Sequence, residues 1–181
     1  MSRLIKQVEA KYKAISAPAA YAGNPLIEAL PPIFTEEQVR EDVKNYPRIA
    51  FTTERALPKH ERVHCVSAIE DLVIPLPSLF DVEAAFSIML RRGYAARPPF
   101  DKKWRRTLFA IQEAMGDPLA EYQVRARTVP AIMLTSVTGG GKTTLAESLL
   151  EMYPQVIIHR KYKDTNFCVK QLVWIRVNAS F

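Results

Sequence analysis

The stretch TSVTGGGKTTL, residues 135–145, constrains this chain more than any other part of its sequence. Three of the chain's six glycines stand together at 139–141, and Lys142 follows them directly. A short apolar run at 131–134 precedes the glycines, and residues 142–152 carry leucine and methionine at helical spacing. Glycine adopts positive φ and lets other groups approach the backbone closely. We therefore predict a buried strand at 131–134, a tight glycine turn and a helix over 142–152.

This order of strand, glycine turn, Gly-Lys-Thr and helix is typical of a phosphate-binding loop. In such a loop, backbone N–H groups and the positive end of the helix dipole face the phosphate oxygens. Lys142 would neutralise the β and γ phosphates, Thr143 would offer its hydroxyl to Mg²⁺, and Thr144 would contact the α phosphate. ATP and Mg²⁺ are the expected cofactors. The predicted nucleotide-binding residues are Ser136, Thr138, Gly139, Gly140, Gly141, Lys142, Thr143 and Thr144.

The motif is incomplete in two respects. Ser136 stands where G-x-x-x-x-G-K-[ST] has its first glycine. A glycine turn that only ends a strand is the alternative, but the flanking strand and helix favour the phosphate site. Hydrolysis also requires an acidic side chain that holds Mg²⁺ at the end of a second strand. The strand predicted at 171–177 runs into Asn178, and Glu70 and Asp71 precede the loop, so we assign no catalytic residue.

Prolines divide the rest of the chain into short elements, since ten of the thirteen lie before residue 100. We predict an amphipathic helix in the first fifteen residues and an extended arm over 16–34. Further helices are expected from Thr35, which opens a capping box, from Asp81, and over 102–115. The second of these helices would bury Val82, Ala85, Phe86, Met89 and Leu90, with Arg91 and Arg92 in its last turn and Gly93 as its cap. Strands are expected at 63–69, 155–159 and 171–177.

The composition favours a reduced, cytoplasmic protein with an anionic partner. The formal net charge is +6, and 48% of the residues are hydrophobic, which is enough to form a core. Cys65 and Cys168 are isolated, the three histidines show no zinc spacing, and no apolar run is long enough to span a bilayer. We expect the cysteines to be half-buried thiols and the histidines to lie on the surface.

Two basic clusters are candidates for contact with DNA. One surrounds Trp104 on the predicted third helix, and the other follows the strand at 155–159. Basic and aromatic side chains together suit phosphate contact and base stacking. A solvated helix face and a solvated turn are the respective alternatives. The candidate residues are Lys102, Lys103, Arg105, Arg106, Lys161 and Lys163, with Arg160 beside the second cluster.

Several stretches together resemble one known family. YAGNPLIEALPP at 21–32 is similar to an NPFIEALPP-type signature, and MLRRGYAARPP at 89–99 is similar to an RxGYxxRNP-type segment. The glycine loop, YPQVIIHR at 153–160 and QLVWIRVNAS at 171–180 continue the likeness. The chain thus resembles the TnsC and TniB proteins, AAA+ regulators of heteromeric cut-and-paste DNA transposons related to Tn-seven.

The resemblance implies an α/β fold with the three-layer core of an ASCE-type P-loop NTPase of the AAA+ class. In that class the sheet order is 5-1-4-3-2. We expect an arm at 1–34, a mixed region of helices and strands at 35–125 that forms a mostly helical extension, and the first part of the core at 126–181. The family continues beyond these residues with its acidic motif, sensors and arginine finger. We therefore expect an N-terminal portion that is marginal alone and that binds ATP rather than hydrolysing it.

The implied function is that of an ATP-binding regulator that oligomerises on DNA and connects target-selection proteins to the transposase. Tyr94 and Arg97 would border the adenine. Two alternatives stay open at this point. One is an adaptor without enzymatic activity that docks through its N-terminal arm, and the other is a small P-loop phosphotransferase.

Overall fold

The computed structural model describes residues 6–14, 18–48, 50–115 and 131–177. The chain divides into two compact units, which we describe separately. The first comprises residues 1–33 together with 84–181, and the second comprises residues 34–83. Within the described residues the chain combines helices with one small mixed sheet. None of the described helices is both long enough and apolar enough to cross a membrane.

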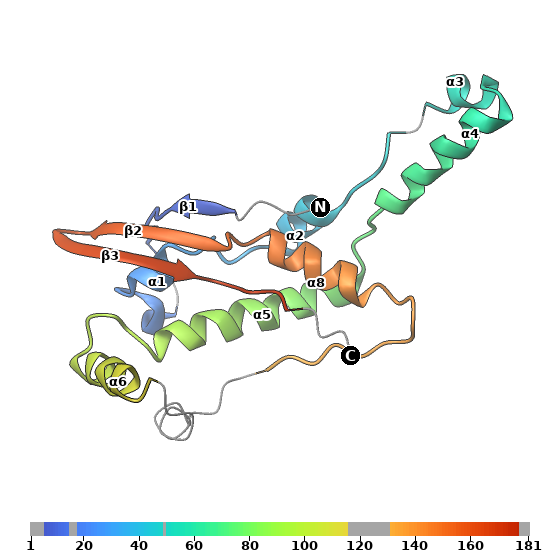
Figure 1. The fold of residues 1–181 in the computed structure, drawn as a ribbon. Helices are drawn as coiled ribbons and strands as arrows, with labels where there is room; N and C mark the ends of the chain where they lie inside the picture. Colours follow the sequence, from blue (N-terminus) through green and yellow to red (C-terminus); the bar gives the residue numbers. More distant parts are fainter. Residues whose placement is uncertain (1–5, 15–17, 49, 116–130, 178–181) are drawn as a thin grey trace. The chain divides into compact units, whose positions relative to one another are not determined.

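A three-stranded sheet of order β1-β2-β3 organises the first unit (Figure 1). Its strands are β1 (Gln7–Glu9), β2 (Val156–Tyr162) and β3 (Thr165–Leu172). β2 and β3 form an antiparallel hairpin, while β1 pairs in parallel with the start of β2. The hairpin turn places Lys163 at φ 51°, a left-handed conformation. Segments from the two ends of the chain thus share one sheet.

A bulge in β2 decides which of its side chains face the core. Ile157 and His159 are buried, as expected for alternate positions of one strand. The pairing register then shifts between His159 and Lys161. One extra residue reverses the alternation, so Tyr162 is buried at 5% exposure while Lys161 remains exposed. The bulge therefore turns one aromatic side chain inward and a lysine outward.

Short helical segments cover the inner face of this sheet. They are η1 (Ala19–Tyr21) and α1 (Pro25–Glu28), and the side chain of Asn24 caps α1 by accepting from the Leu26 N–H at 3.1 Å. Pro25 occupies the first helical position, which suits its fixed φ. Gln171 of β3 donates to the Leu26 carbonyl at 2.9 Å, and Tyr162 of β2 donates to Glu28 at 2.9 Å. Both strands of the hairpin are thereby attached to α1.

The long helix α5 (Pro77–Ala95) has a polar buried face. Glu83, Ser87 and Arg91 follow one another at intervals of four, and each is at most 3% exposed. Arg91 donates to the Pro31 carbonyl at 2.6 Å and to the Ser87 hydroxyl. The predicted apolar face is only partly buried, so that prediction is wrong in its choice of face. Its members Val82, Phe86, Met89 and Leu90 are of intermediate exposure and Ala85 is exposed.

Two further helices belong to the first unit, α6 (Lys102–Glu113) and α8 (Lys142–Glu151). Both confirm predicted helices. The Asp101 side chain caps α6 by accepting from the Lys103 N–H at 2.9 Å. Gly93 lies inside α5, which continues to Ala95, so its predicted role as a cap is wrong.

The second unit is helical and contains α2 (Glu36–Val43), α3 (Phe51–Ala56), α4 (Lys59–Val66) and η2 (Ser67–Asp71). Thr35 and Gln38 form the predicted capping box of α2, and the predicted apolar residues Val39 and Val43 are buried. The predicted strand at 63–69 is wrong. Pro58 is the N-cap residue of α4, which begins at Lys59 with polar residues. The helix continues through the β-branched residues Val63 and Val66 and is followed directly by η2.

The strand at 155–159 is confirmed, but three other expectations near the sheet are wrong. Residues 131–134 form no strand: they pair with none of the three strands, and Met133 is 85% exposed, so the run does not provide the buried surface expected of a core strand. β3 spans 165–172 rather than 171–177, since the turn at 163–164 fixes the register of the hairpin. Gln7–Glu9 form a strand instead of a helix, because pairing with β2 outweighs local propensity.

The extended conformation expected over 16–34 is also wrong where the structure describes it. η1 and α1 occupy this stretch, and Tyr21, Ile27 and Leu30 are buried. The boundaries predicted at Gly116, at 126 and at Asn178 lie outside the described residues.

Candidate functional site

The candidate site is the turn that leads from residues 135–138 into α8. Gly139 and Gly141 have φ values of 80° and 72°, a region that side chains other than glycine's rarely adopt. Gly141 is the N-cap residue of α8, and no side chain accepts a hydrogen bond there. A helix without a side-chain cap leaves its first N–H groups for water or for an anion. The turn therefore ends at the backbone N–H donors of the first turn of α8 and at the positive end of the α8 dipole.

Gly140 is required for a different reason, namely space. A Cβ atom at this position would lie 2.1 Å from Ser136 Oγ and 3.1 Å from the Val137 carbonyl oxygen. The Gly140 N–H also donates to that carbonyl at 3.1 Å and closes the turn. Ser136 thus packs against the one glycine of the three that has negative φ. All three glycines have a conformational or steric role in this turn.

Lys142 folds back over the turn. Its Nζ atom donates to the Ser136 and Val137 carbonyl oxygens, each at 2.9 Å. The ammonium group is therefore held over the loop, where a phosphate oxygen could replace either carbonyl as acceptor. Thr143 and Thr144 follow in the first turn of α8 and are exposed. Thr138 lies in the turn itself and is also exposed.

The surroundings of the loop differ from those predicted. Residues 131–134 were expected to be buried, yet Met133 is 85% exposed. α8 packs instead through Leu149, and Glu147 pairs with Arg176 of the segment after β3. Trp174 of that segment donates to the Tyr153 carbonyl at 3.2 Å. The C-terminal segment therefore contacts α8 and the residues that follow it.

Tyr94 and Arg97, the predicted adenine-side residues, contact residues other than those of the loop. The Tyr94 hydroxyl donates to the Leu172 carbonyl at 3.3 Å, and the Tyr94 carbonyl accepts from Asn24 at 2.9 Å. The Arg97 guanidinium lies 5.8 Å from the centre of the Trp104 ring. Burial raises the pKa of Tyr94. The structure brings these two residues next to α6 and β3, and their role at the adenine stays a prediction.

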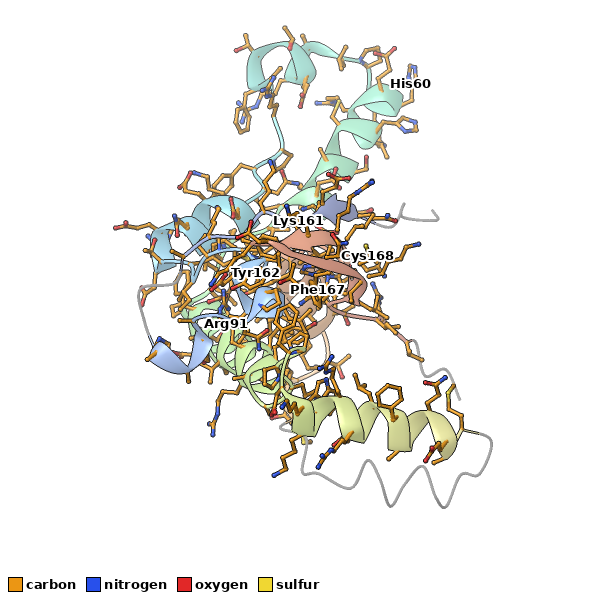
Figure 2. All side chains as sticks on the ribbon, turned by 90° about the vertical axis from the view of Figure 1, so that its left-hand side faces the viewer. His60, Arg91, Lys161, Tyr162, Phe167 and Cys168 are labelled. Carbon is orange, nitrogen blue, oxygen red and sulfur yellow. The ribbon has the colours of Figure 1, made fainter. Side chains whose placement is uncertain are left out.

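The basic residues predicted in two clusters are exposed, and Phe100 connects the elements that carry them. Lys102, Lys103, Arg105 and Arg106 lie on α6 with Trp104 partly buried. Phe100 precedes this helix and stacks on Tyr162, with ring centres 5.9 Å apart, and it contacts Phe167 at 5.3 Å. Lys161 and Lys163 flank Tyr162 at the hairpin end, which Figure 2 views from the front. The start of α6 and the hairpin end are thus neighbours.

A buried polar network around His159 was missed, because this histidine was expected on the surface. His159 is 1% exposed, and its two ring nitrogens lie 2.8 Å from the Tyr12 hydroxyl and 2.8 Å from Gln171 Oε1. Gln171 donates its amide to the Leu26 carbonyl, so its Oε1 atom accepts from His159 Nε2–H. The ring then accepts from Tyr12 at Nδ1. The alternation of Ile157 and His159 along β2 is the only sequence signal that could have indicated this burial.

The Glu28 carboxylate lies at the edge of the same network. Tyr162 donates to Glu28 Oε2, and Gly23 donates to Glu28 Oε1 at 2.8 Å. Burial and the Glu28 carboxylate raise the pKa of Tyr162 to about 12. Burial also raises the pKa of Tyr12, and the Glu28 charge adds to this effect. Both phenols therefore stay protonated at neutral pH and act as donors.

We expect the stability of the first unit to fall in acid because of His159. Burial lowers the pKa of this imidazole below its ordinary value of 6.5. The unfolded chain then binds more protons than the folded chain as the pH drops. The contribution is complete above pH 6.5 and is lost as the pH falls through the folded pKa. Urea unfolding at pH 7.5 and pH 5 should show a larger loss for the parent than for His159→Gln, which cannot titrate.

Cys65 is partly exposed and Cys168 is exposed, and both are free thiols. In the part of the chain that the structure describes, no three His, Cys, Asp or Glu side chains cluster to hold a metal ion. No protein-family model matches the chain, and no curated protein matches it in a sequence search. The function is therefore inferred from the residues themselves.

Proposed function

We propose that the chain binds Mg·ATP at residues 136–144. The observation that supports this most is the start of α8, where a left-handed Gly141 caps the helix without a side-chain acceptor and Lys142 lies over the turn. Phosphate oxygens satisfy such N–H groups, and the helix dipole favours their charge. The sequence order of the phosphate-binding motif gives the same ligand class.

Each residue of the loop has an expected role in this proposal. The N–H groups of Gly139 and Gly141 would donate to the β phosphate, while the Gly140 N–H keeps the turn closed on the Val137 carbonyl. Lys142 would exchange its carbonyl acceptors for β and γ oxygens. Thr143 would supply a hydroxyl ligand to Mg²⁺, whose charge offsets that of the triphosphate. Ser136, Thr138 and Thr144 would border the phosphates.

Isothermal titration calorimetry of the full chain with ATP and with ADP, in the presence of Mg²⁺, tests this proposal. We expect saturable binding of one nucleotide per chain. The heat should be lost when inorganic phosphate replaces the nucleotide at the same concentration, because a single phosphate engages fewer donors. A folded sample that shows no affinity for either nucleotide would exclude the assignment.

We further propose that the bound nucleotide serves regulation of DNA transposition, as the resemblance to TnsC and TniB implies. An AAA+ P-loop core, homo-oligomers on DNA, and partnership with a transposase and target-selection proteins belong to this proposal. Tyr94 and Arg97 would approach the adenine in that assembly. The resemblance in YAGNPLIEALPP supports this choice because its residues are well placed for a structural role: Asn24 is a buried cap, and Pro25 and Ile27 are buried.

The adjacent basic residues of α6 and the hairpin end would contact the DNA backbone. We expect Lys161→Glu combined with Lys163→Glu to weaken binding of a random-sequence duplex and to lower the slope of log K against log salt by about 2. Fluorescence anisotropy across a salt series measures both quantities. The control Arg48→Glu with Arg55→Glu makes the same change in net charge on exposed residues of the other unit. Equal losses in both pairs would show that only the overall charge matters.

A further inference from the structure

The basic side of α6 carries a large aromatic side chain that is open to solvent. Phe109 is 66% exposed. Residues three, four or seven positions apart lie on the same side of an α-helix, so Phe109 shares its side with three cations: Lys102, Arg105 and Arg106. All three cations are exposed, and none forms an ion pair within the part of the chain that the structure describes. On this side of α6, positive charges therefore flank the ring.

Trp104 is the aromatic residue for which the sequence predicted a stacking role, but the structure partly covers it. Trp104 lies five residues before Phe109, on a different side of α6, and is only partly exposed. The Arg97 guanidinium lies 5.8 Å from the centre of its ring and occupies one face. Phe109 makes no ring contact with the described residues. Phe109 is therefore the better placed of the two rings to stack on a ligand.

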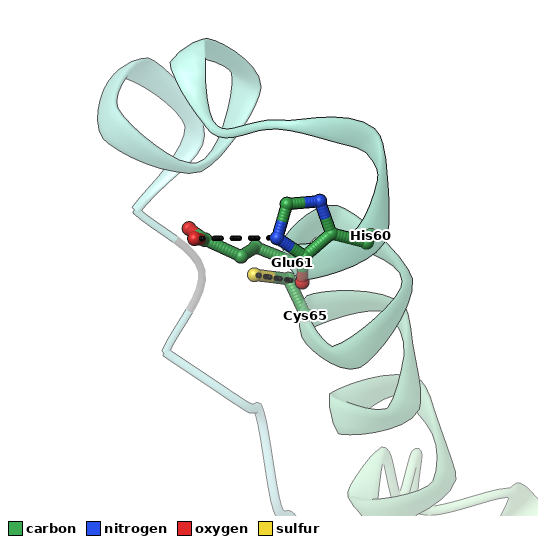
Figure 3. Close-up of polar contacts among 3 residues, drawn as sticks. All are labelled: His60, Glu61 and Cys65. Carbon is green, nitrogen blue, oxygen red and sulfur yellow. Dashed lines mark hydrogen bonds and ion pairs between the residues drawn. The ribbon is translucent and has the colours of Figure 1, made fainter.

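α4 also has exposed apolar residues beside basic ones, but of a different kind. The exposed apolar residues are Val63 and Val66, which have no aromatic face. Polar groups at the start of this helix contact one another, as Figure 3 shows. His60 Nε2 lies 3.7 Å from Glu61 Oε1, and Cys65 Sγ lies 3.7 Å from the Glu61 carbonyl oxygen. α6 differs from α4 because it combines an open aromatic ring with several cations.

The basic surface extends from α6 to the hairpin end. Phe100 stacks on Tyr162, so the exposed Lys161 and Lys163 lie near the start of α6. From that start, the cations follow the helix for about 10 Å to Phe109, at 1.5 Å per residue. A chain of phosphates that follows these cations would bring its bases to the ring.

We propose that this surface binds single-stranded DNA, with phosphates on Lys102, Arg105 and Arg106 and one base stacked on Phe109. This inference rests on the DNA contact proposed above for the same basic residues and adds the form of DNA. Aromatic rings beside cations bind unpaired bases of any sequence. In an undistorted duplex, neighbouring base pairs cover the faces of the bases, so the ring has no base to stack on. A membrane suits this side of α6 less well, because membrane-bound helices present a broad apolar face.

Fluorescence anisotropy tests the proposal with a labelled oligothymidine of about 12 nucleotides and a duplex of the same length. We expect Phe109→Ala to weaken oligothymidine binding by about tenfold and to change duplex binding by less than about twofold. Phe109→Trp should keep the affinity of the parent. Phe109→Leu keeps the apolar character but lacks a ring, and should bind as weakly as the alanine variant. The matched control is Phe51→Ala, since Phe51 is 64% exposed on α3, and it should bind as the parent does.

Phe109→Trp also gives a direct signal of stacking. Oligothymidine should quench the fluorescence of the introduced indole, measured as the difference between this variant and the parent, which has its own two tryptophans. The duplex should leave that difference unchanged. Because Phe109 is exposed, circular dichroism should show unchanged folding in every variant at this position.

The outcomes separate this inference from the DNA proposal on which it rests. Equal oligothymidine affinities of the parent and Phe109→Ala would overturn the stacking, while a loss of duplex binding in Lys161→Glu with Lys163→Glu would still support DNA contact. Equal losses of Phe109→Ala on oligothymidine and on the duplex would also overturn the stacking. A parent that binds neither form of DNA would contradict both proposals.

Two further measurements test the identity of the ligand. Oligouridine that binds more tightly than oligothymidine would assign the surface to RNA and overturn the assignment to DNA. Vesicles of phosphatidylserine and phosphatidylcholine should not sediment with the chain. If they do, and if Phe109→Ala abolishes this while oligothymidine does not bind, the surface belongs to a membrane contact and the proposal is wrong.

Discussion

Replacing Lys142 with alanine is expected to weaken Mg·ATP binding by about a hundredfold or more. The change removes the ammonium group that donates to the Ser136 and Val137 carbonyls and that lies over the proposed phosphate site. Charge-assisted hydrogen bonds to phosphate are among the strongest polar contacts in proteins. Titration calorimetry or displacement of a fluorescent ATP analogue measures the loss.

The matched control is Lys170→Ala, which removes an equal charge from an exposed position on β3. It should bind nucleotide as the parent does. Lys142 is only partly buried, so Lys142→Ala should unfold at the parent's temperature. If the alanine variant binds the analogue as tightly as the parent, the loop does not hold the phosphates, and the assignment of ATP and Mg²⁺ fails with it.

Arg91→Ala is expected to lower the free energy of unfolding by about 2–4 kcal/mol, the largest stability effect that we predict. Arg91 is 1% exposed, and its guanidinium donates to the Pro31 carbonyl and to Ser87. Truncation leaves these acceptors unsatisfied and opens a cavity where the guanidinium was buried, next to Pro31. Denaturant unfolding monitored by circular dichroism gives the difference.

Arg92 provides a close comparison, because it is the adjacent residue of the same helix and of the same type. It is exposed, and Arg92→Ala should change the free energy of unfolding by no more than about 0.5 kcal/mol. The sequence predicted the same role for both residues, namely a positive charge near the helix end. Similar losses for the two variants would mean that this charge stabilises the protein and that the burial of Arg91 adds nothing.

The features that could be predicted from the sequence depend on neighbouring residues. The capping box of Thr35 and Gln38, the glycine turn before α8 and the helix that follows all involve groups within a few positions of each other. Local propensity and spacing are sufficient for such features. For this reason the residues of the candidate loop could be named without a structure, although the surroundings of the loop could not.

The features that could not be predicted depend on distant residues. His159 is buried because Tyr12 and Gln171 supply its partners, and Arg91 is buried because Pro31 offers a carbonyl. A polar side chain is predicted to be exposed from the sequence, because its burial requires a hydrogen-bond partner that the sequence does not reveal. The two basic clusters likewise lie close together because Phe100, which precedes α6, packs against β2 and β3.

The pairing of β1 with β2 has a consequence for how this chain is made. Gln7 pairs with Val156, so β1 finds its neighbour only after the segment through β2 has left the ribosome. Contacts between residues this far apart in sequence form slowly, because a long loop must close first. Until then Val8 and Tyr12 lack their partners on β2, and this segment stays open to binding by a chaperone.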